Sequence, residues 1–67
     1  NDDVILKYRI AGLLLEYKQE KEALKMLSAA MNQDFSQIEY FFDLSPKALK
    51  NRKIKKLIND FRANSTL

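Results

Sequence analysis

The sequence predicts an all-α fold, a small bundle of three to four helices in which an N-terminal helical hairpin precedes two shorter helices. Hydrophobic residues make up 46% of the 67-residue chain, which is too apolar for a disordered segment. One glycine and one proline are too few turn-forming residues for a β protein. The chain also lacks cysteine and histidine, so neither disulfides nor the usual zinc ligands can stabilise it.

The length of the chain allows one domain at most, at a size where a single hydrophobic core is only marginally stable. We therefore expect either an efficient helical core or association with another chain. The sequence begins with Asn1 rather than methionine, which indicates a fragment of a larger protein. The absence of cysteine fits an intracellular setting. The sequence shows no signal peptide and no run of about 18 apolar residues, so we expect no membrane segment.

The first predicted helix covers residues 3–18 and is apolar on two sides. Its main face consists of Leu6, Ile10, Leu13, Leu14 and Tyr17. A second, nearly opposite face consists of Val4, Tyr8, Ala11 and Leu15. A helix of this kind normally has a neighbour on each side. We expect the main face to be covered within the chain, which leaves the second face for a partner.

The apolar four-three spacing of the main face continues to Met31 except at Glu20, and two interpretations remain open. Residues 18–22 contain no helix-breaking residue, which favours one long helix over residues 3–32. Such a helix would be about 40 Å long and largely exposed. We favour a hairpin with a second helix over residues 20–32. The inward residues of that helix are then Ala23, Leu24, Leu27, Ala30 and Met31.

A capping-box pattern at Asp34 and Gln37 predicts the third helix, over residues 35–43. This segment contains a dense aromatic cluster that includes Phe41 and Phe42. We expect both phenylalanines to contribute to a partner interface, because aromatic side chains supply much of the binding energy at such surfaces.

Ser45 and Pro46 predict the start of a fourth helix over residues 46–62, followed by a tail over residues 63–67. On one continuous helix, Leu49 points about 130° away from the apolar face that begins at Ile54. Either Leu49 packs only against the start of this helix, or the helix begins again at Asn51.

Catalysis is not expected. The chain has no histidine or cysteine for acid–base or thiol chemistry and no glycine-rich phosphate loop, so we predict no enzyme activity, no cofactor and no small-molecule substrate. Asp34, Glu39 and Asp43 are the one acidic group that invites a metal-binding interpretation, and surface charge explains them better. We therefore predict no metal site.

The strongest local charge feature is a basic run without an intervening acid. It consists of Lys47, Lys50, Arg52, Lys53, Lys55 and Lys56. Clustered lysine and arginine supply the sequence-independent part of nucleic-acid affinity. The competing interpretation is the solvated face of an amphipathic helix, which the modest net charge of +3 favours. Residues 51–56 also match the pattern of a nuclear import signal, so we expect a nuclear rather than a cytoplasmic location.

Two resemblances suggest binding functions. The stretch from Leu27 to Ile38, followed by Tyr40–Phe42 and Pro46–Leu49, is similar to the helix-turn-helix segment of tetracycline-repressor-type regulators. That resemblance implies a reading helix over residues 35–42 that presents Ser36, Gln37 and Tyr40 to bases.

The spacing of Ala11, Leu14, Ala23, Leu27 and Ala30 is similar to a single tetratricopeptide-type helical hairpin and to LisH-type dimerisation hairpins. Both families bind proteins. A lone hairpin differs from a tetratricopeptide solenoid, which needs about three stacked repeats. The sequence also lacks the glycine-containing turn that is usual in LisH hairpins.

We therefore predict a non-catalytic interaction and self-association module of a larger protein. Its expected partner is a second copy or another helical protein. The predicted partner interface consists of Val4, Tyr8, Ala11, Leu15, Phe41 and Phe42. The alternative is a helix-turn-helix-like nucleic-acid-binding domain that uses the basic run.

Overall fold

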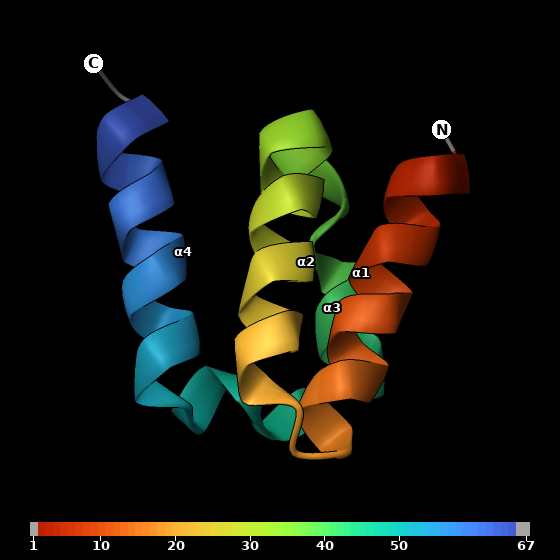
Figure 1. Cartoon of the computed structure of the whole chain (residues 1–67). Helices are drawn as coiled ribbons and strands as arrows, with labels where there is room; N and C mark the ends of the chain where they lie inside the picture. The colour runs from red at the N-terminus through yellow and green to blue at the C-terminus, as the bar shows by residue number, and fades with distance from the viewer. Residues whose placement is uncertain (1, 66–67) are drawn as a thin grey trace.

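The computed structural model describes residues 2–65, and every regular element among them is helical (Figure 1). The helices are α1 Asp2–Glu16, α2 Glu20–Asp34, α3 Glu39–Leu44 and α4 Arg52–Ser65. Two short 3-10 turns, η1 Phe35–Gln37 and η2 Pro46–Lys50, precede α3 and α4. The predicted all-α bundle, with a helical hairpin followed by two shorter helices, is confirmed.

Helix α1 ends in a tight turn at Lys18, whose backbone is left-handed with a φ of 67°. The amide of Gln19 donates to the carbonyl of Leu14 at 2.8 Å, and the amide of Lys18 donates to that of Leu15 at 3.1 Å. These two bonds form a Schellman motif, which satisfies carbonyls at the helix end. Helix α2 then returns beside α1, so the hairpin interpretation is correct and the long helix is excluded.

The core uses the face of α1 opposite to the one that we expected. Val4, Tyr8 and Ala11 have no exposed surface, whereas Leu6 is 56% and Leu13 is 45% exposed. The prediction that the Leu6–Tyr17 face packs inward was therefore wrong.

Two features of α1 explain this orientation. A Cβ atom on Gly12 would lie 2.9 Å from Cβ of Leu44 and 3.1 Å from the carbonyl oxygen of Phe41, so the missing side chain lets α1 and α3 approach closely. The hydroxyl of Tyr8 donates to the carbonyl of Asp34 at 2.7 Å. This bond satisfies the polar end of a large side chain, so its ring can be buried without an unpaired hydroxyl.

Helix α2 packs with the residues that its spacing predicts. Ala23, Leu27, Ala30 and Met31 are buried, and Leu24 is half-buried. The helix ends at Asp34 rather than at residue 32.

The third predicted helix, residues 35–43, is divided into η1 and α3. Asp34 is a cap, as predicted, because its Oδ1 accepts from the amide of Ser36 at 3.1 Å and from its hydroxyl at 2.6 Å. Phe41 of α3 is fully buried. Phe35 of η1 instead stacks on Phe61 of α4, with ring centroids 5.2 Å apart, and so ties the end of α2 to the last helix.

The fourth predicted helix, residues 46–62, is likewise divided, and Asn51 separates its two parts in an extended conformation. Oδ1 of Asn51 accepts from the amides of Lys53 at 2.9 Å and Ile54 at 3.1 Å, which is an N-cap. The helix therefore begins again at Asn51, and Leu49 is 60% exposed. Helix α4 continues to Ser65, so residues 63–65 are helical rather than a tail, and residues 66–67 lie outside the described residues.

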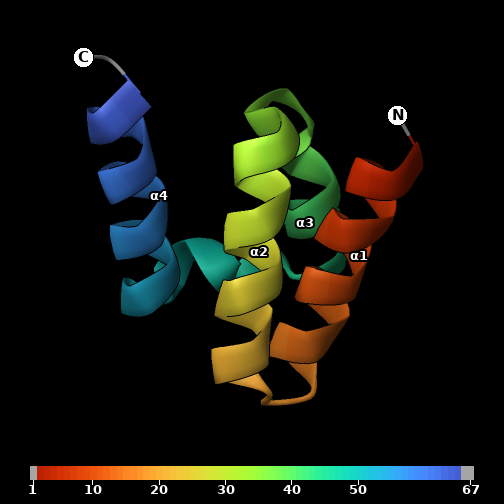
Figure 2. The same ribbon diagram turned by 45° about the horizontal axis from the view of Figure 1, so that its top comes forward.

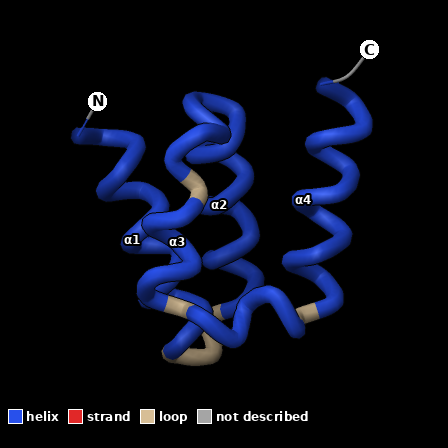
Figure 3. The backbone as a smooth tube through the Cα atoms, turned by 180° about the vertical axis from the view of Figure 1, so that it is seen from behind, coloured by secondary structure: helices blue, strands red, loops and turns tan. Residues whose placement is uncertain are grey.

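The described bundle is flat, with extents of 34 × 28 × 17 Å. Helix α2 occupies the middle, and α1 and α4 form opposite edges (Figures 1 and 3). Helix α3 packs on α1 behind the plane of the other helices. In Figure 2, η2 passes behind α2 to connect α3 with α4. The two edges of the bundle thus face away from each other.

Candidate interaction surfaces

The predicted partner interface is largely inside the folded chain. Val4, Tyr8, Ala11 and Phe41 are fully buried in one core cluster, so they have no surface to offer a partner. Leu15 and Phe42 are half-buried and pack against that cluster. The prediction of a surface role was wrong for the four buried residues because α2 and α3 cover the face of α1 that we had assigned to a partner.

Among the described residues, an apolar surface left uncovered lies instead on the opposite face of α1. Its residues, which we call the α1 stripe, are Leu6, Ile10 and Leu13 of α1 and Tyr17, which directly follows the helix. Tyr17 is 74% exposed, more than Leu6 and Leu13, and Ile10 is half-buried. Exposed large apolar residues in line on one helix face are a feature of interaction sites rather than of scattered surface residues.

Polar contacts hold both flanks of the α1 stripe in place. On one flank, Nζ of Lys7 donates to Oε1 of Gln33 on α2 at 2.7 Å. On the other, the guanidinium of Arg9 lies 5.3 Å from the ring centroid of Tyr40 on α3. These contacts fix the rotation of α1, so the stripe is presented on a defined surface at the edge of the bundle.

A second candidate surface runs from η2, near the hairpin turn, to α4 at the opposite edge. All six residues of the predicted basic run are exposed, and we call them the basic edge: Lys47, Lys50, Arg52, Lys53, Lys55 and Lys56. Lys53 pairs with Glu20 at 3.2 Å and Lys56 with Asp60 at 3.1 Å. The run is thus on the surface, as required for the predicted phosphate contacts, and two of its charges are partly neutralised.

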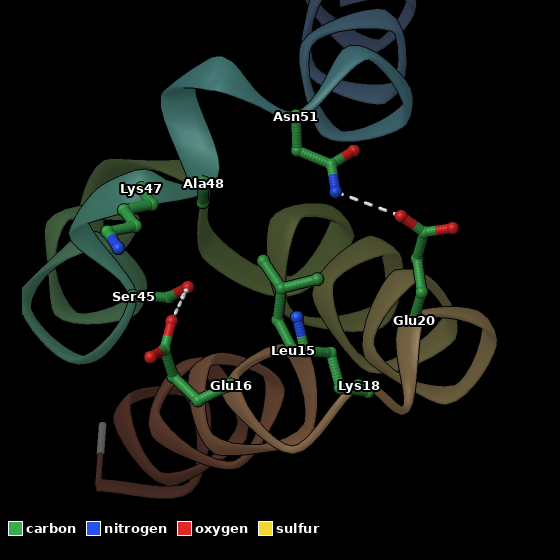
Figure 4. A pocket seen from close by; sticks show the side chains of 8 residues that line it. All are labelled: Leu15, Glu16, Lys18, Glu20, Ser45, Lys47, Ala48 and Asn51. Carbon is green, nitrogen blue, oxygen red and sulfur yellow. Dashed lines mark hydrogen bonds between the residues drawn. The ribbon is translucent and has the colours of Figure 1, made fainter.

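A pocket of about 500 Å³ lies where the hairpin turn meets η2 (Figure 4). It is lined by Leu15, Glu16, Lys18, Glu20, Ser45, Lys47, Ala48 and Asn51. Its two carboxylates are held by groups from distant parts of the chain. The buried hydroxyl of Ser45 donates to Oε2 of Glu16 at 2.7 Å, and Nδ2 of Asn51 donates to Oε2 of Glu20 at 2.9 Å. These bonds join the hairpin turn to the segment that leads into α4.

Glu20, which interrupts the apolar spacing of the sequence, connects the two halves of the chain. The hydrogen bonds from Asn51 and Lys53 lower the pKa of its carboxyl below the ordinary value. The sequence pattern marks Glu20 as an exception. Its partners could not be predicted because they lie some thirty residues away.

Tyr8 and Asp34 form a second polar junction, between α1 and the start of η1. Burial, with a smaller contribution from the charge of Asp34, raises the pKa of Tyr8 to about 12. Hydrogen bonds from Ser36 and Gln37 lower the pKa of Asp34. Both shifts stabilise the protonation states that these groups have at neutral pH.

The segment that resembles a reading helix does not have the geometry of one. Residues 35–42 are divided between a three-residue 3-10 turn and the start of a six-residue helix. The hydroxyl of Ser36 donates to Asp34, and the ring of Tyr40 faces Arg9. A helix-turn-helix places one continuous helix in the major groove, so the described structure does not support that resemblance.

Residues 2–65 present neither a metal-binding group nor a membrane-spanning helix. No group of three or more Asp, Glu, His or Cys residues is placed to hold a metal ion, and the acidic residues Asp34, Glu39 and Asp43 form no such group. None of the described helices combines the length and the apolar character needed to cross a membrane.

Comparison with models of protein families, with curated proteins and with solved structures gave no match to this chain.

Proposed function

We propose that this chain is a non-catalytic self-association module, in which the α1 stripe packs against the α1 stripe of a second copy. The observation that carries this proposal is the exposure of Leu6, Leu13 and Tyr17 on one face of a well-packed helix. Their four-three-four spacing with Ile10 is the spacing of a helix seam that pairs with another helix.

A second copy fits the stripe because the four-three-four spacing is the same in both directions along the chain. When two α1 helices pair antiparallel around a two-fold axis, Leu6 lies level with the second copy's Tyr17, and Ile10 with its Leu13. Every apolar residue then meets an apolar residue, as an isologous interface requires.

The charges on one flank of the stripe fit the same arrangement, whereas the other flank brings Lys7 near the second copy's Lys18. Arg9 and Glu16 lie on one flank of α1, seven residues apart. The antiparallel pairing brings equivalent flanks together and places Arg9 within about one helical turn of the second copy's Glu16. A parallel pairing would bring unlike flanks together and lose this complementarity.

The size of the surface sets the expected strength. Helix α1 has 15 residues and is about 22 Å long, and one of its faces offers less than the ~800 Å² per partner of a typical stable interface. We therefore expect a dissociation constant in the micromolar range rather than a permanent dimer.

Sedimentation equilibrium over a range of concentrations tests the proposal. The mass of the wild-type chain should rise from 7.9 kDa toward twice that value. The variant Leu6→Glu/Tyr17→Glu should stay monomeric with unchanged helix content, because both side chains are exposed. Leu49→Glu places one negative charge on a leucine of similar exposure outside the stripe and should associate like the wild type. The proposal would be refuted by a wild-type chain that stays monomeric, or by an equal loss of association in both variants.

An intracellular setting, with a nuclear rather than cytoplasmic location, is part of the same proposal. The exposure of Arg52, Lys53, Lys55 and Lys56 supports it, because a targeting signal must be accessible. Imaging a fluorescent fusion tests the location, with substitution of these four residues by glutamine as the comparison.

A further inference from the structure

We propose that the basic edge on η2 and α4 binds the phosphate backbone of a nucleic acid without reading its sequence. This site is separate from the α1 stripe and does not depend on the proposed self-association. The ligand class is a polyphosphate strand, contacted by lysine and arginine side chains.

Charge is segregated along the chain. Residues 46–67 carry seven lysines and arginines and a single acid, Asp60, whereas residues 1–45 carry five basic and eight acidic residues. The modest net charge of +3 therefore conceals a basic end and an acidic remainder. A local positive surface, rather than the net charge, decides where a polyanion binds.

Four cations of the basic edge are available to a ligand. Lys53 and Lys56 are engaged by Glu20 and Asp60. Lys47, Lys50, Arg52 and Lys55 are exposed and make no ion pair with any of residues 2–65. Arg52 and Lys55 also line a shallow depression on α4 together with Asn59 and the ion pair of Lys56 and Asp60. The amide of Asn59 adds a neutral donor. These groups satisfy the main requirement for phosphate binding.

The apolar face of α4 argues against a lipid surface as the ligand. A membrane-bound amphipathic helix must insert its apolar side chains among lipids. In α4, Ile54 is fully buried, and Leu57, Ile58 and Phe61 pack against the core of the same chain. Only the charged face remains for contact, and that face can bind phosphates but cannot insert.

The composition of the edge favours binding without sequence specificity. Five of its six cations are lysines, which act as flexible point charges, whereas bidentate recognition of guanine is favoured by the planar fork of arginine. The described fold also lacks a continuous reading helix over residues 35–42. Both features indicate that the basic edge contacts the phosphate backbone of the nucleic acid rather than its bases.

Fluorescence anisotropy with a labelled DNA duplex of mixed sequence tests the proposal. If the four available cations contact phosphates, the logarithm of the association constant should fall with the logarithm of salt concentration with a slope of about −3.6. A second duplex of unrelated sequence should bind with the same affinity. Absence of binding at low salt would overturn the proposal.

Two double variants give a matched comparison. Arg52→Gln/Lys55→Gln removes two charges from the basic edge, and Lys21→Gln/Lys25→Gln removes two charges from exposed positions on α2. The first variant should lower the salt slope to about −1.8 and weaken binding at low salt at least tenfold. The second should keep the wild-type slope. An equal loss of DNA affinity in both double variants would mean that net charge alone attracts the DNA, and this result would overturn the proposed site.

Competition identifies the class of ligand. Unlabelled DNA should displace the labelled duplex, whereas phosphatidylcholine–phosphatidylserine vesicles and polyglutamate at the same concentration of negative charge should displace it far less. Equal displacement by vesicles would assign the edge to a membrane surface. Equal displacement by polyglutamate would assign it to an acidic protein. Either result would overturn the nucleic-acid proposal.

Discussion

The side-chain amide of Asn51 donates to Oε2 of Glu20 across 2.9 Å and so joins the cap of α4 to the first residue of α2. The other atom of the same amide group, Oδ1, accepts from the backbone amides of Lys53 and Ile54. One side chain therefore both starts α4 and attaches it to the hairpin.

Replacement of Asn51 tests this double role. Asn51→Ala removes the cap and the bond to Glu20, so we expect the free energy of unfolding to fall by about 1–2 kcal/mol, the upper part of the range for a lost N-cap. Urea denaturation followed by circular dichroism measures the change. Asn59→Ala, at an exposed position inside the same helix, should cause no loss. Similar losses in the two variants would contradict the capping role.

Lys18 occupies a left-handed position at which glycine avoids a steric penalty. We expect Lys18→Gly to raise the free energy of unfolding by about 1 kcal/mol, and hence the melting temperature by about 4–8 °C. Thermal denaturation checks this. Lys21→Gly, in the first turn of α2, should change stability by a similar amount in the opposite direction. A loss of stability in Lys18→Gly would show that this turn is not strained.

Gly12 lies at a close approach of α1 and α3, and alanine should not fit there. The added Cβ would meet Cβ of Leu44 and the carbonyl oxygen of Phe41, neither of which can move without its backbone. We expect Gly12→Ala to lower the free energy of unfolding by about 1–3 kcal/mol, although alanine is intrinsically the better helix former by about 1 kcal/mol. A melting temperature equal to or above that of the wild type would show that α3 shifts without loss.

Tyr8 should make the fold sensitive to alkaline pH. Its pKa is about 12 in the folded chain and 10.0 ordinarily, so the folded state holds the phenolic proton more tightly than the unfolded state. The resulting stabilisation is complete below pH 10 and is lost as pH rises toward 12. Urea denaturation at several pH values should show this fall in the free energy of unfolding.

Tyr8→Phe is the comparison for this titration. The variant lacks the hydrogen bond to Asp34 and should be less stable at neutral pH, but its free energy of unfolding should depend less on pH between 10 and 12. All other titratable groups are the same in both proteins, so the difference between the two pH profiles reports Tyr8. Equal slopes would contradict the raised pKa.

The fold class and most boundaries followed from local rules. The scarcity of glycine and proline predicts helices, Asp34 and Pro46 mark the start of elements, and the break at Glu20 predicts the hairpin. The restart at Asn51 was visible as the phase shift of Leu49, although that shift alone left two interpretations open. These features depend on interactions between residues near one another in the sequence.

Such local rules could not determine which of the two apolar faces of α1 packs into the core. Both faces have the period of a packed helix, and the stripe of Leu6 and Tyr17 has the more regular spacing. The orientation of α1 is decided by the fit of Gly12 against α3 and by the hydrogen bond from the hydroxyl of Tyr8 to the carbonyl of Asp34. Both partners are distant in the sequence, so the predicted interface fell on the buried face while the basic run was correctly expected at the surface.

Helices α1 and α4 lie on opposite edges of the flat bundle with α2 between them, so a contact made by one edge leaves the other uncovered. Two chains joined through α1 would therefore carry a basic edge at each end of the dimer. Once one basic edge binds a long polyanion, the other is held at a high effective concentration near the same molecule. Such bivalency can strengthen binding by about 10²–10⁴-fold. Weak pairing and weak phosphate contacts would then reinforce each other, and retention on the polyanion would depend on how many copies are present.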